Sequence, residues 1–304
     1  MLRRALQGKV AAEVSPPTPS NSSLQMSSKA RGFNHVLLPG RVTCTGDIAD
    51  YSGKLEDGRL VAVKKLSLDT SQQGEPEFLV EVRMITSIQH KNLVRLLGCC
   101  SDGPQRLLVY EYMQNRSLDL MVPNNNWHCK RIAVLHEDSH LRVVHRDIKA
   151  SYILLDDKFQ PRIGDFELAR FIPEDQAYLS TTFAGTLGYT APEYAIRGEL
   201  SEKADIYSFG VLVLEIISCR KNRPYFTIGN AAWMLYKRSM VLDLVDPKMR
   251  EDGFEEENVL KAIHVAFLCL QPHANLRPPM SEIVPMLTCK VELDRTPMRP
   301  PFLD

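Results

Sequence analysis

Two charged residues in the middle of the chain, Asp147 and Lys149, are the first candidates for chemistry. They follow the apolar pair Val143–Val144 and are separated by a single residue, so one loop can present a carboxylate and an ammonium to the same cleft. Transfer of a phosphoryl group needs a carboxylate that orients the attacking hydroxyl and a cation that offsets the charge of the transferring group. The pair therefore indicates phosphoryl transfer, although an exposed charged loop would explain either residue alone.

Three more charged residues could complete such a site. Asp165 lies eighteen positions beyond Asp147, and its carboxylate could hold Mg²⁺ against nucleotide phosphates. Lys64 ends an apolar strand-like run, and a Lys buried at a strand end needs an acidic partner. Glu81, in the middle of an expected helix, is the natural partner, and the pair would fix the ammonium on the α- and β-phosphates.

Glu193, Asp205 and Arg277 are interpreted as scaffolding rather than chemistry. Glu193 ends the turn-rich segment 185–193, and Arg277 is the expected ion-pair partner of its carboxylate. Asp205 is expected to open a helix, where a carboxylate interacts favourably with the helix dipole.

The elements that must position these residues change in kind along the chain. Strand patterns at 60–64 and 107–110 and a helix pattern at 77–88 occupy the first third. The remainder is mainly helical, with helices expected at 204–218, 233–245, 259–270 and 281–287. This order predicts an α+β chain of two lobes, with a junction near 111–113.

Bulk composition limits the class of protein. Lys+Arg and Asp+Glu both number 37 among 304 residues, which argues against recognition of nucleic acid through bulk charge. The seven cysteines are odd in number and irregularly spaced, which favours a reducing compartment over a disulfide framework or zinc site. No apolar run approaches the roughly 18 residues of a membrane span, so no transmembrane segment is predicted.

Ordered motifs along the chain resemble the protein-kinase family, and most closely the plant receptor-like and receptor-like cytoplasmic kinases of the Pelle/IRAK type. The resemblance covers about residues 50–290 and rests on Val61–Lys64, Glu81, His90–Gly98, Leu108–Met113, His145–Lys149, Asp165–Phe166, Ala191–Glu193 and Asp205–Val211. It implies a β-rich N-lobe at about 41–112 and a mainly helical C-lobe at about 113–290, forming one kinase domain over 41–290. Residues 1–40 are expected to be a disordered leader and 291–304 a C-terminal tail.

The resemblance also implies a nucleotide site. ATP is expected between the lobes, with the backbone of Glu111 to Met113 taking the adenine, Tyr110 at the gatekeeper position, and Lys64 and Gly46 near the phosphates. Mg²⁺ is the expected metal, held by Asp165. Protein substrates and an upstream kinase or receptor are the expected partners.

The same resemblance implies regulation through the activation segment. Asp147-x-Lys149 with the downstream Gly185–Thr186 looks like the Ser/Thr version of the family, in which Thr186 would bridge Asp147 and Lys149. Arg146 matches kinases whose arginine binds a phosphate added to the activation segment. The candidate phosphate acceptors are Ser180, Thr181 and Thr182.

Four departures from the family pattern bear on activity. The glycine-rich loop retains only Gly46, Tyr152 stands where the family has an asparagine that binds metal, and Glu167 replaces the glycine after Asp165–Phe166. The stretch 127–136 is also about nine residues shorter than the family spacing.

These departures leave three hypotheses open: a Ser/Thr kinase of reduced activity, a pseudokinase acting as a binding scaffold, and a decayed or truncated gene product. The intact charged set favours the first, because losing any of its members would remove transition-state stabilisation. Because no membrane anchor is predicted, we expect a cytoplasmic location, with membrane association arising through partners. The chain would then be either a cytoplasmic relative of the receptor-like kinases or a shortened sequence.

Overall fold

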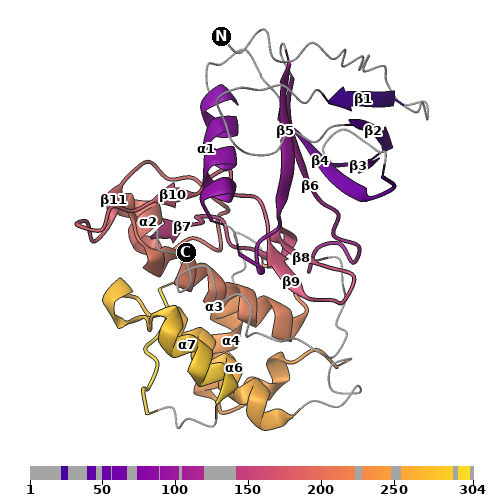
Figure 1. The fold of residues 1–304 in the computed structure, drawn as a ribbon. Helices are drawn as coiled ribbons and strands as arrows, with labels where there is room; N and C mark the ends of the chain where they lie inside the picture. The colour runs from indigo at the N-terminus through magenta and orange to yellow at the C-terminus, as the bar shows by residue number, and fades with distance from the viewer. Residues whose placement is uncertain are drawn as a thin grey trace. The chain divides into compact units, whose positions relative to one another are not determined.

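This computed structural model describes residues 22–26, 40–45, 50–55, 57–66, 74–88, 90–102, 105–119, 142–222, 228–247, 255–289 and 294–301. The chain divides into two compact units, residues 1–114 and 115–304. Figure 1 shows that the first unit is rich in strands and the second mainly helical. The predicted α+β chain with a strand-rich first unit and a mainly helical second unit is therefore confirmed. Gly46 and the stretch 127–136 lie outside the described residues.

The described strands of the first unit form an antiparallel sheet in the order β1-β2-β3-β4-β6-β5. Their bounds are β1 Ser22–Met26, β2 Gly40–Thr45, β3 Asp50–Lys54, β4 Leu60–Leu66, β5 Leu96–Asp102 and β6 Gln105–Glu111. In the central pair, Val63 of β4 lies opposite Val109 of β6, and both are buried. Alternate β-branched residues of β4 face the core, as a half-buried strand requires. Lys64 lies within β4, two residues before the strand ends at Leu66.

β1 departs from the prediction that residues 1–40 form a disordered leader. Its five residues pair with β2, from Ser22 opposite Cys44 to Met26 opposite Gly40. The segment contains neither proline nor glycine, unlike the proline-rich stretch before it, so its backbone can join the sheet edge. The other residues of the expected leader up to residue 39 lie outside the described ranges.

The helix α1 (Gly74–Ser87) lies beside the sheet near β5. It begins three residues before the predicted start at 77. Phe78, Ile85 and Ile88 are buried at helical spacing and form its apolar face. Glu81 lies on that same face with no exposed surface, so its carboxylate requires partners inside the unit.

The second unit contains short two-stranded ladders and a helical core. The elements are β7 Val143–Val144, 3₁₀ helix η3 Ala150–Tyr152, β8 Ile153–Leu155, β9 Pro161–Ile163, β10 Arg170–Phe171, β11 Leu179–Ser180, α2 Pro192–Arg197, β12 Glu199–Leu200, α3 Glu202–Ser218, α4 Ile228–Lys237, 3₁₀ helix η4 Val241–Leu244, α6 Glu256–Cys269, 3₁₀ helix η5 Ala274–Leu276 and α7 Met280–Thr288. The ladders pair β7 with β10, β8 with β9, and β11 with β12. The loop after β7 carries the expected motif His145–Lys149, and the segment after β9 carries Asp165–Phe166.

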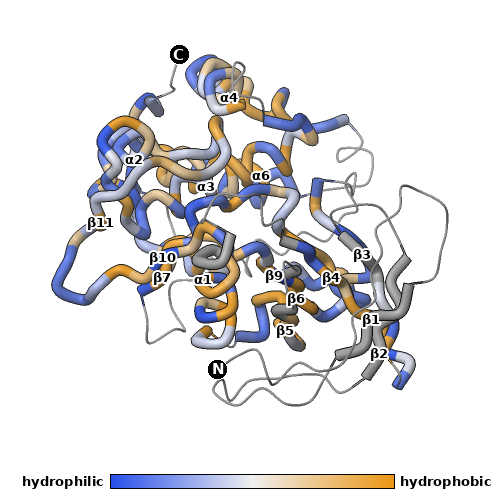
Figure 2. The backbone as a smooth tube through the Cα atoms, turned by 90° about the horizontal axis from the view of Figure 1, so that it is seen from above, coloured by the Kyte–Doolittle hydropathy of each residue, from blue (hydrophilic) through white to orange (hydrophobic). Residues whose placement is uncertain are grey.

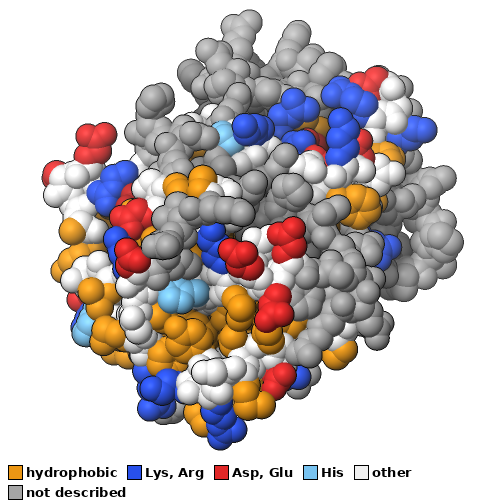
Figure 3. All heavy atoms as spheres, turned by 90° about the horizontal axis from the view of Figure 1, so that it is seen from below, with side chains coloured by type: hydrophobic (Ala, Val, Ile, Leu, Met, Phe, Trp, Pro, Cys, Tyr) orange, Lys and Arg blue, Asp and Glu red, His pale blue; other side chains and the backbone are white. Residues whose placement is uncertain are grey.

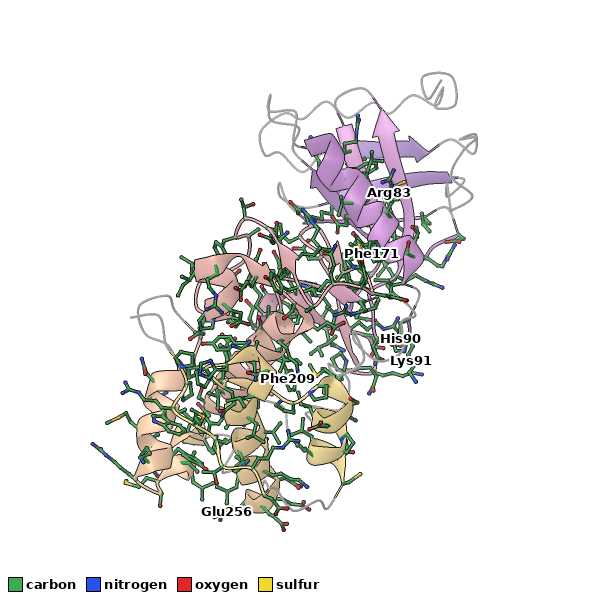
Figure 4. The ribbon with its side chains drawn as sticks, turned by 90° about the vertical axis from the view of Figure 1, so that its left-hand side faces the viewer. Arg83, His90, Lys91, Phe171, Phe209 and Glu256 are labelled. Carbon is green, nitrogen blue, oxygen red and sulfur yellow. The ribbon has the colours of Figure 1, made fainter. Side chains whose placement is uncertain are left out.

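α3 is the core helix of this unit and is buried over most of its length. The hydropathy colouring in Figure 2 is orange along much of α3, and Phe209 lies among neighbouring side chains in Figure 4, whereas Glu256 lies exposed at the start of α6. A Cβ added to Gly210 would lie 2.9 Å from both the carbonyl oxygen of Ala266 and the Cβ of Cys269. Glycine at this position therefore allows α3 to pack closely against α6.

The predicted helix over 233–245 is wrong in its bounds. α4 starts earlier, at Ile228, and ends at Lys237, and η4 follows it. Ser239 adopts a left-handed backbone with φ of 56°, which interrupts the helix although the apolar periodicity continues. The helices predicted at 204–218, 259–270 and 281–287 agree with α3, α6 and α7 within a few residues.

The segment 294–301 packs on the helices of the second unit. Pro297 and Pro300 are buried, and the Tyr207 hydroxyl donates to the carbonyl oxygen of Pro301 at 3.1 Å. The amide of Met298 donates to the side-chain oxygen of Gln271 at 3.3 Å. This part of the expected tail is thus bound to α3 and to the residues after α6.

The surface agrees with the balanced charge of the chain. Figure 3 shows acidic, basic and hydrophobic side chains interspersed on the displayed face, and no single sign dominates there. Among the described residues, no helix is both long and apolar enough to cross a bilayer.

Candidate active site

In the first unit, Lys64 on β4 and Glu81 on α1 form an ion pair. The Lys64 ammonium lies 3.1 Å from Glu81 Oε2 and 3.5 Å from Oε1. Glu81 is fully buried, whereas the Lys64 side chain is 23% exposed. The pairing keeps a buried carboxylate compensated by a lysine whose side chain is partly exposed.

Tyr110, at the expected gatekeeper position on β6, is a second partner of Glu81. Its hydroxyl donates to Glu81 Oε1 at 2.5 Å, and the ring is buried. A hydrogen bond to an ionised acceptor is among the stronger ones in proteins. The gatekeeper therefore helps to fix the carboxylate that orients Lys64.

The segment expected to recognise adenine continues from β6. Glu111 is tied to Arg95 through two hydrogen bonds, because the Glu111 amide donates to the Arg95 carbonyl at 3.0 Å and the Arg95 amide donates to Glu111 Oε1 at 2.8 Å. Met113 is buried at 7% exposure. The backbone at this end of the strand is thus held in one conformation.

In the second unit, Asp147, Lys149 and Thr186 meet. The Lys149 ammonium donates to Asp147 Oδ2 at 2.8 Å and to Thr186 Oγ1 at 2.9 Å. Lys149 thus joins the other two residues. Asp147 Oδ1 is buried and has no hydrogen-bond partner within the part of the chain that the structure describes. That oxygen has the acceptor capacity needed to receive a hydroxyl group.

Asp205 holds the loop that carries Asp147. Its carboxylate accepts hydrogen bonds from the backbone amides of His145 at 2.7 Å and Arg146 at 2.9 Å. α3 begins at Glu202, so Asp205 lies in the first turn and does not open the helix as expected. The N-cap is Ser201, whose hydroxyl accepts from the Lys203 amide and starts the helix earlier.

The segment around Gly185 packs closely against the same loop. Gly185 has φ of 135°, and an added Cβ would lie 2.7 Å from the carbonyl oxygen of Arg146. Both its backbone conformation and the close contact require glycine at this position. This contact places the neighbouring Thr186 within reach of Lys149.

Asp165 follows β9 in a left-handed backbone conformation with φ of 64°. One of its carboxylate oxygens lies within 4.8 Å of a carboxylate oxygen of Glu167, the residue that replaces the expected glycine. Two carboxylates at this spacing are the hard oxygen donors that suit a divalent cation such as Mg²⁺. The donor chemistry of this pair therefore fits the metal that the sequence predicts.

Tyr152 ends η3, three residues beyond Lys149. Its ring centroid lies 4.0 Å from the Lys149 ammonium. Where the family pattern has an amide oxygen, this chain thus places an aromatic ring against the candidate catalytic lysine.

Arg146 is held by neutral acceptors within the second unit. Its guanidinium donates to the Tyr194 hydroxyl, to the Thr182 carbonyl at 2.9 Å and to the Leu168 carbonyl at 3.3 Å. Its backbone has φ of 74°. Ser180 and Thr182 are exposed, and Thr181 is half-buried. The backbone of the activation segment is thus a direct partner of Arg146.

Glu193 and Arg277 form a buried bidentate pair. The two guanidinium nitrogens of Arg277 lie 2.6 and 2.8 Å from the two carboxylate oxygens of Glu193. Arg277 also lies over the ring of Tyr207 and donates to the carbonyls of Gln271 and Lys203. The pair connects α2 to the segment after η5.

The hydrogen bonds of three tyrosines were not predicted from the sequence, although Tyr110 itself was expected at the gatekeeper position. Tyr194 binds Arg146, the Tyr110 hydroxyl binds Glu81, and the Tyr189 hydroxyl donates to Glu215 at 2.5 Å. All three rings are buried. A buried tyrosine needs a partner for its hydroxyl, so tyrosines inside apolar patterns were the available signal.

Comparison with known proteins agrees with this geometry. Residues 44–287 match the family model for protein tyrosine and serine/threonine kinases. Cysteine-rich receptor-like protein kinase 1 of Arabidopsis thaliana is 44% identical over 307 residues, which cover 94% of this chain and 49% of that protein. Cold-responsive protein kinase 1 of the same plant is 43% identical over 268 residues, covering 80% and 68% of the two chains. A probable LRR receptor-like serine/threonine-protein kinase is 42% identical over 273 residues, covering 83% and 26%.

These matches confirm the expected likeness to plant receptor-like kinases. The chain spans about half the length of the cysteine-rich relative and about a quarter of the LRR relative. Family membership carries with it the general use of ATP and a divalent metal. With the family model covering most of its length, the chain belongs to the protein tyrosine and serine/threonine kinase family.

Proposed function

We propose that this protein transfers the γ-phosphoryl group of Mg-ATP to serine and threonine hydroxyls of protein substrates. The observation that carries the proposal is the arrangement of Asp147, Lys149 and Thr186, in which the ammonium of Lys149 contacts both oxygen groups. Asp147 keeps one buried carboxylate oxygen unpartnered among the described residues. The relatives named as serine/threonine kinases support the same substrate class.

The site residues of the second unit have distinct roles in this proposed reaction. Asp147 accepts the substrate hydroxyl through Oδ1 and orients it for attack, and Lys149 offsets the negative charge of the group being transferred. Thr186 keeps the ammonium beside Asp147, and Asp205 fixes the loop backbone. Asp165 and Glu167 would hold Mg²⁺, which supplies charge neutralisation at the phosphates when bound.

The first unit would bind the nucleotide. Lys64, oriented by Glu81, would contact the α- and β-phosphates, and Glu81 is oriented in turn by Tyr110. The backbone of Glu111 to Met113 would take the adenine, and Gly46 would lie near the phosphates. Cytoplasmic location agrees with the free thiols at Cys99, Cys100, Cys219, Cys269 and Cys289.

Activation would involve three hydroxyls of the activation segment, of which Ser180 and Thr182 are exposed and Thr181 is half-buried. A phosphate added to Ser180, Thr181 or Thr182 would compete for the Arg146 guanidinium with its neutral acceptors. An ionised phosphate forms stronger hydrogen bonds with arginine than a carbonyl does. An upstream kinase or receptor would supply this phosphate, or the chain would add it to a second copy.

The proposal is tested with the purified full chain, radiolabelled Mg-ATP and a generic basic protein substrate. We expect labelled phosphoserine and phosphothreonine, and loss of the label in Asp147→Asn, which retains the shape but not the charge of the residue. Mg-ATP should also raise the thermal midpoint of both proteins. Thermal stabilisation without transfer by the unmodified chain would instead support a nucleotide-binding scaffold, and the absence of both effects would refute ATP use.

A further inference from the structure

Tyr152 is in direct contact with the candidate catalytic lysine. The Lys149 ammonium lies over its ring, 4.0 Å from the centroid. The same ammonium donates to Asp147 Oδ2 and Thr186 Oγ1 at 2.8 and 2.9 Å. Lys149 is thus contacted by a carboxylate, a hydroxyl and an aromatic face, and its side chain is only 19% exposed.

The backbone of Tyr152 is held on both sides. Its amide donates to the Lys149 carbonyl at 3.1 Å, which closes the 3₁₀ turn of η3. Its carbonyl accepts from the Gly164 amide at 3.0 Å, which ties it to the residue before Asp165. The backbone that carries the ring is therefore fixed relative to both Lys149 and Gly164.

The ring also continues a short aromatic series. Its centroid lies 6.4 Å from that of His145, and the His145 ring makes an edge contact with Phe166 at 4.9 Å. His145 is itself fixed by a hydrogen bond of 3.0 Å between Nε2 and the Gly164 carbonyl oxygen. Phe166 and His145 are almost completely buried, so the inner part of the series belongs to the rigid core.

We propose that Tyr152 is a positioning residue for Lys149, whose ammonium it holds beside Asp147 and Thr186 through a cation–π contact. A cation within about 6 Å of an aromatic centroid is attracted by the negative face of the ring, most strongly when water is excluded. The inference rests on the proposed kinase function, because it assigns a role within that reaction. The proposal also explains what Tyr152 contributes where the family pattern has an asparagine. The tyrosine lacks the amide oxygen, but it offers the face of its ring to the lysine.

The contact is tested first without catalysis. The full chain is labelled with ¹³C at lysine Cε, and the Lys149 signal is assigned by its disappearance in Lys149→Arg. Because protons above an aromatic ring are shielded, we expect the Lys149 Hε signal upfield of the other lysines. Tyr152→Leu should remove the upfield shift and Tyr152→Phe should retain it. An unshifted signal in the unmodified chain overturns the contact, whether or not the protein is a kinase.

Kinetics test the positioning role. In Tyr152→Leu we expect kcat to fall roughly threefold to tenfold, the range expected for losing one cation–π contact, while KM for ATP stays close to its original value. Tyr152→Phe, which keeps the ring, should recover most of the lost kcat. Phe159→Leu, at an exposed aromatic residue in the same unit, is the matched control for folding and surface effects.

The two experiments separate the possible failures. If the Lys149 Hε signal of the unmodified chain is shifted upfield but Tyr152→Leu has the same kcat as the unmodified chain, the contact exists and the positioning role is overturned. A kcat loss in Tyr152→Leu that Tyr152→Phe does not recover would assign the effect to the hydroxyl and overturn the proposal. Absence of phosphoryl transfer by the unmodified chain would refute the proposed function, whereas the chemical shift would still decide whether the ring and the ammonium are in contact.

Discussion

Glu81 accepts hydrogen bonds from two residues on adjacent strands, and the shorter bond comes from the Tyr110 hydroxyl at 2.5 Å. Lys64 on β4 is also a donor, at 3.1 Å. The carboxylate has no exposed surface, so solvent cannot replace either partner. The expected gatekeeper is therefore coupled to the lysine through one shared acid.

Tyr110→Phe removes the hydroxyl and keeps the ring. We expect the free energy of unfolding to fall by about 1.5–3 kcal/mol, the usual contribution of a hydrogen bond to a charged group, because Glu81 is left with fewer donors. KM for ATP should rise as Lys64 loses its fixed position. Urea denaturation and ATP titration measure the two effects. Tyr178→Phe, at an exposed tyrosine of the second unit, is the control and should change neither quantity.

Glu167→Gln tests the carboxylate pair with Asp165. Removing one negative charge within 4.8 Å of the other carboxylate should weaken the attraction of a divalent cation. We expect the Mg²⁺ concentration for half-maximal activity to rise roughly threefold to tenfold. The same change at exposed Glu174 controls for general charge effects. Equal Mg²⁺ dependence in both variants would exclude Glu167 from the metal site.

Arg277→Met leaves the buried carboxylate of Glu193 without its charged partner. Removal of one member of a buried pair destabilises a protein by about 3–5 kcal/mol, so a large drop in the denaturation midpoint is expected. Arg197 pairs with Glu199 at 3.0 Å on the surface, with 63% of the arginine side chain exposed. Arg197→Met should therefore cost about 1 kcal/mol or less. Similar losses in the two variants would contradict a distinct structural role for the buried pair.

The pH dependence of stability should contain a contribution from Glu215. Burial raises the pKa of this carboxyl above its ordinary value of 4.5, although the Tyr189 hydroxyl and the Asn222 amide oppose the shift. The folded state then binds the proton more tightly than the unfolded state, so this contribution is fully present below pH 4.5 and is lost as pH rises through the folded-state pKa. Glu215→Gln should make the decline in unfolding free energy between pH 4.5 and neutrality less steep.

The pKa of Asp156 is shifted in the direction opposite to that of Glu215. Burial alone would raise its pKa, but the amides of Gln160 and Lys158 and the Arg162 guanidinium lower it below 3.8. This residue stabilises the fold above pH 3.8, and that stability is lost as pH falls through the depressed pKa. Asp156→Asn should therefore change the acid side of the profile and leave the decline above pH 4.5 unchanged. A profile that both substitutions leave unaltered would rule out these two carboxyls as its source.

Local patterns predicted the parts of the fold that depend on periodicity. The apolar spacing of 78, 85 and 88 marks the buried face of α1, and the apolar run that predicted a strand over 60–64 lies within β4, which continues to Leu66. The need of a buried lysine for an acid suggested Glu81 without knowledge of the fold. The matched motifs likewise indicated two lobes and their composition.

Contacts between distant segments could not be obtained in this way. Asp205 binds backbone amides about sixty positions earlier in the chain, and a backbone amide carries no residue-specific signal in the sequence. Ser239 ends α4 through a left-handed conformation that the apolar pattern does not encode. The ring of Tyr152 could be recognised only as a departure from the family pattern until its contact with Lys149 was visible.

The close packing at Gly210 determines how the protein would respond to a substitution at this position. A single methyl group there would meet the backbone oxygen of Ala266, which a rotamer change cannot relieve, so α3 and α6 must separate. Because α3 also carries Asp205, a small separation reaches the catalytic loop without altering any of its residues. We expect Gly210→Ala to lower the thermal midpoint of the purified chain, so that the loop fixed by Asp205 loses its geometry on warming while it is retained at low temperature.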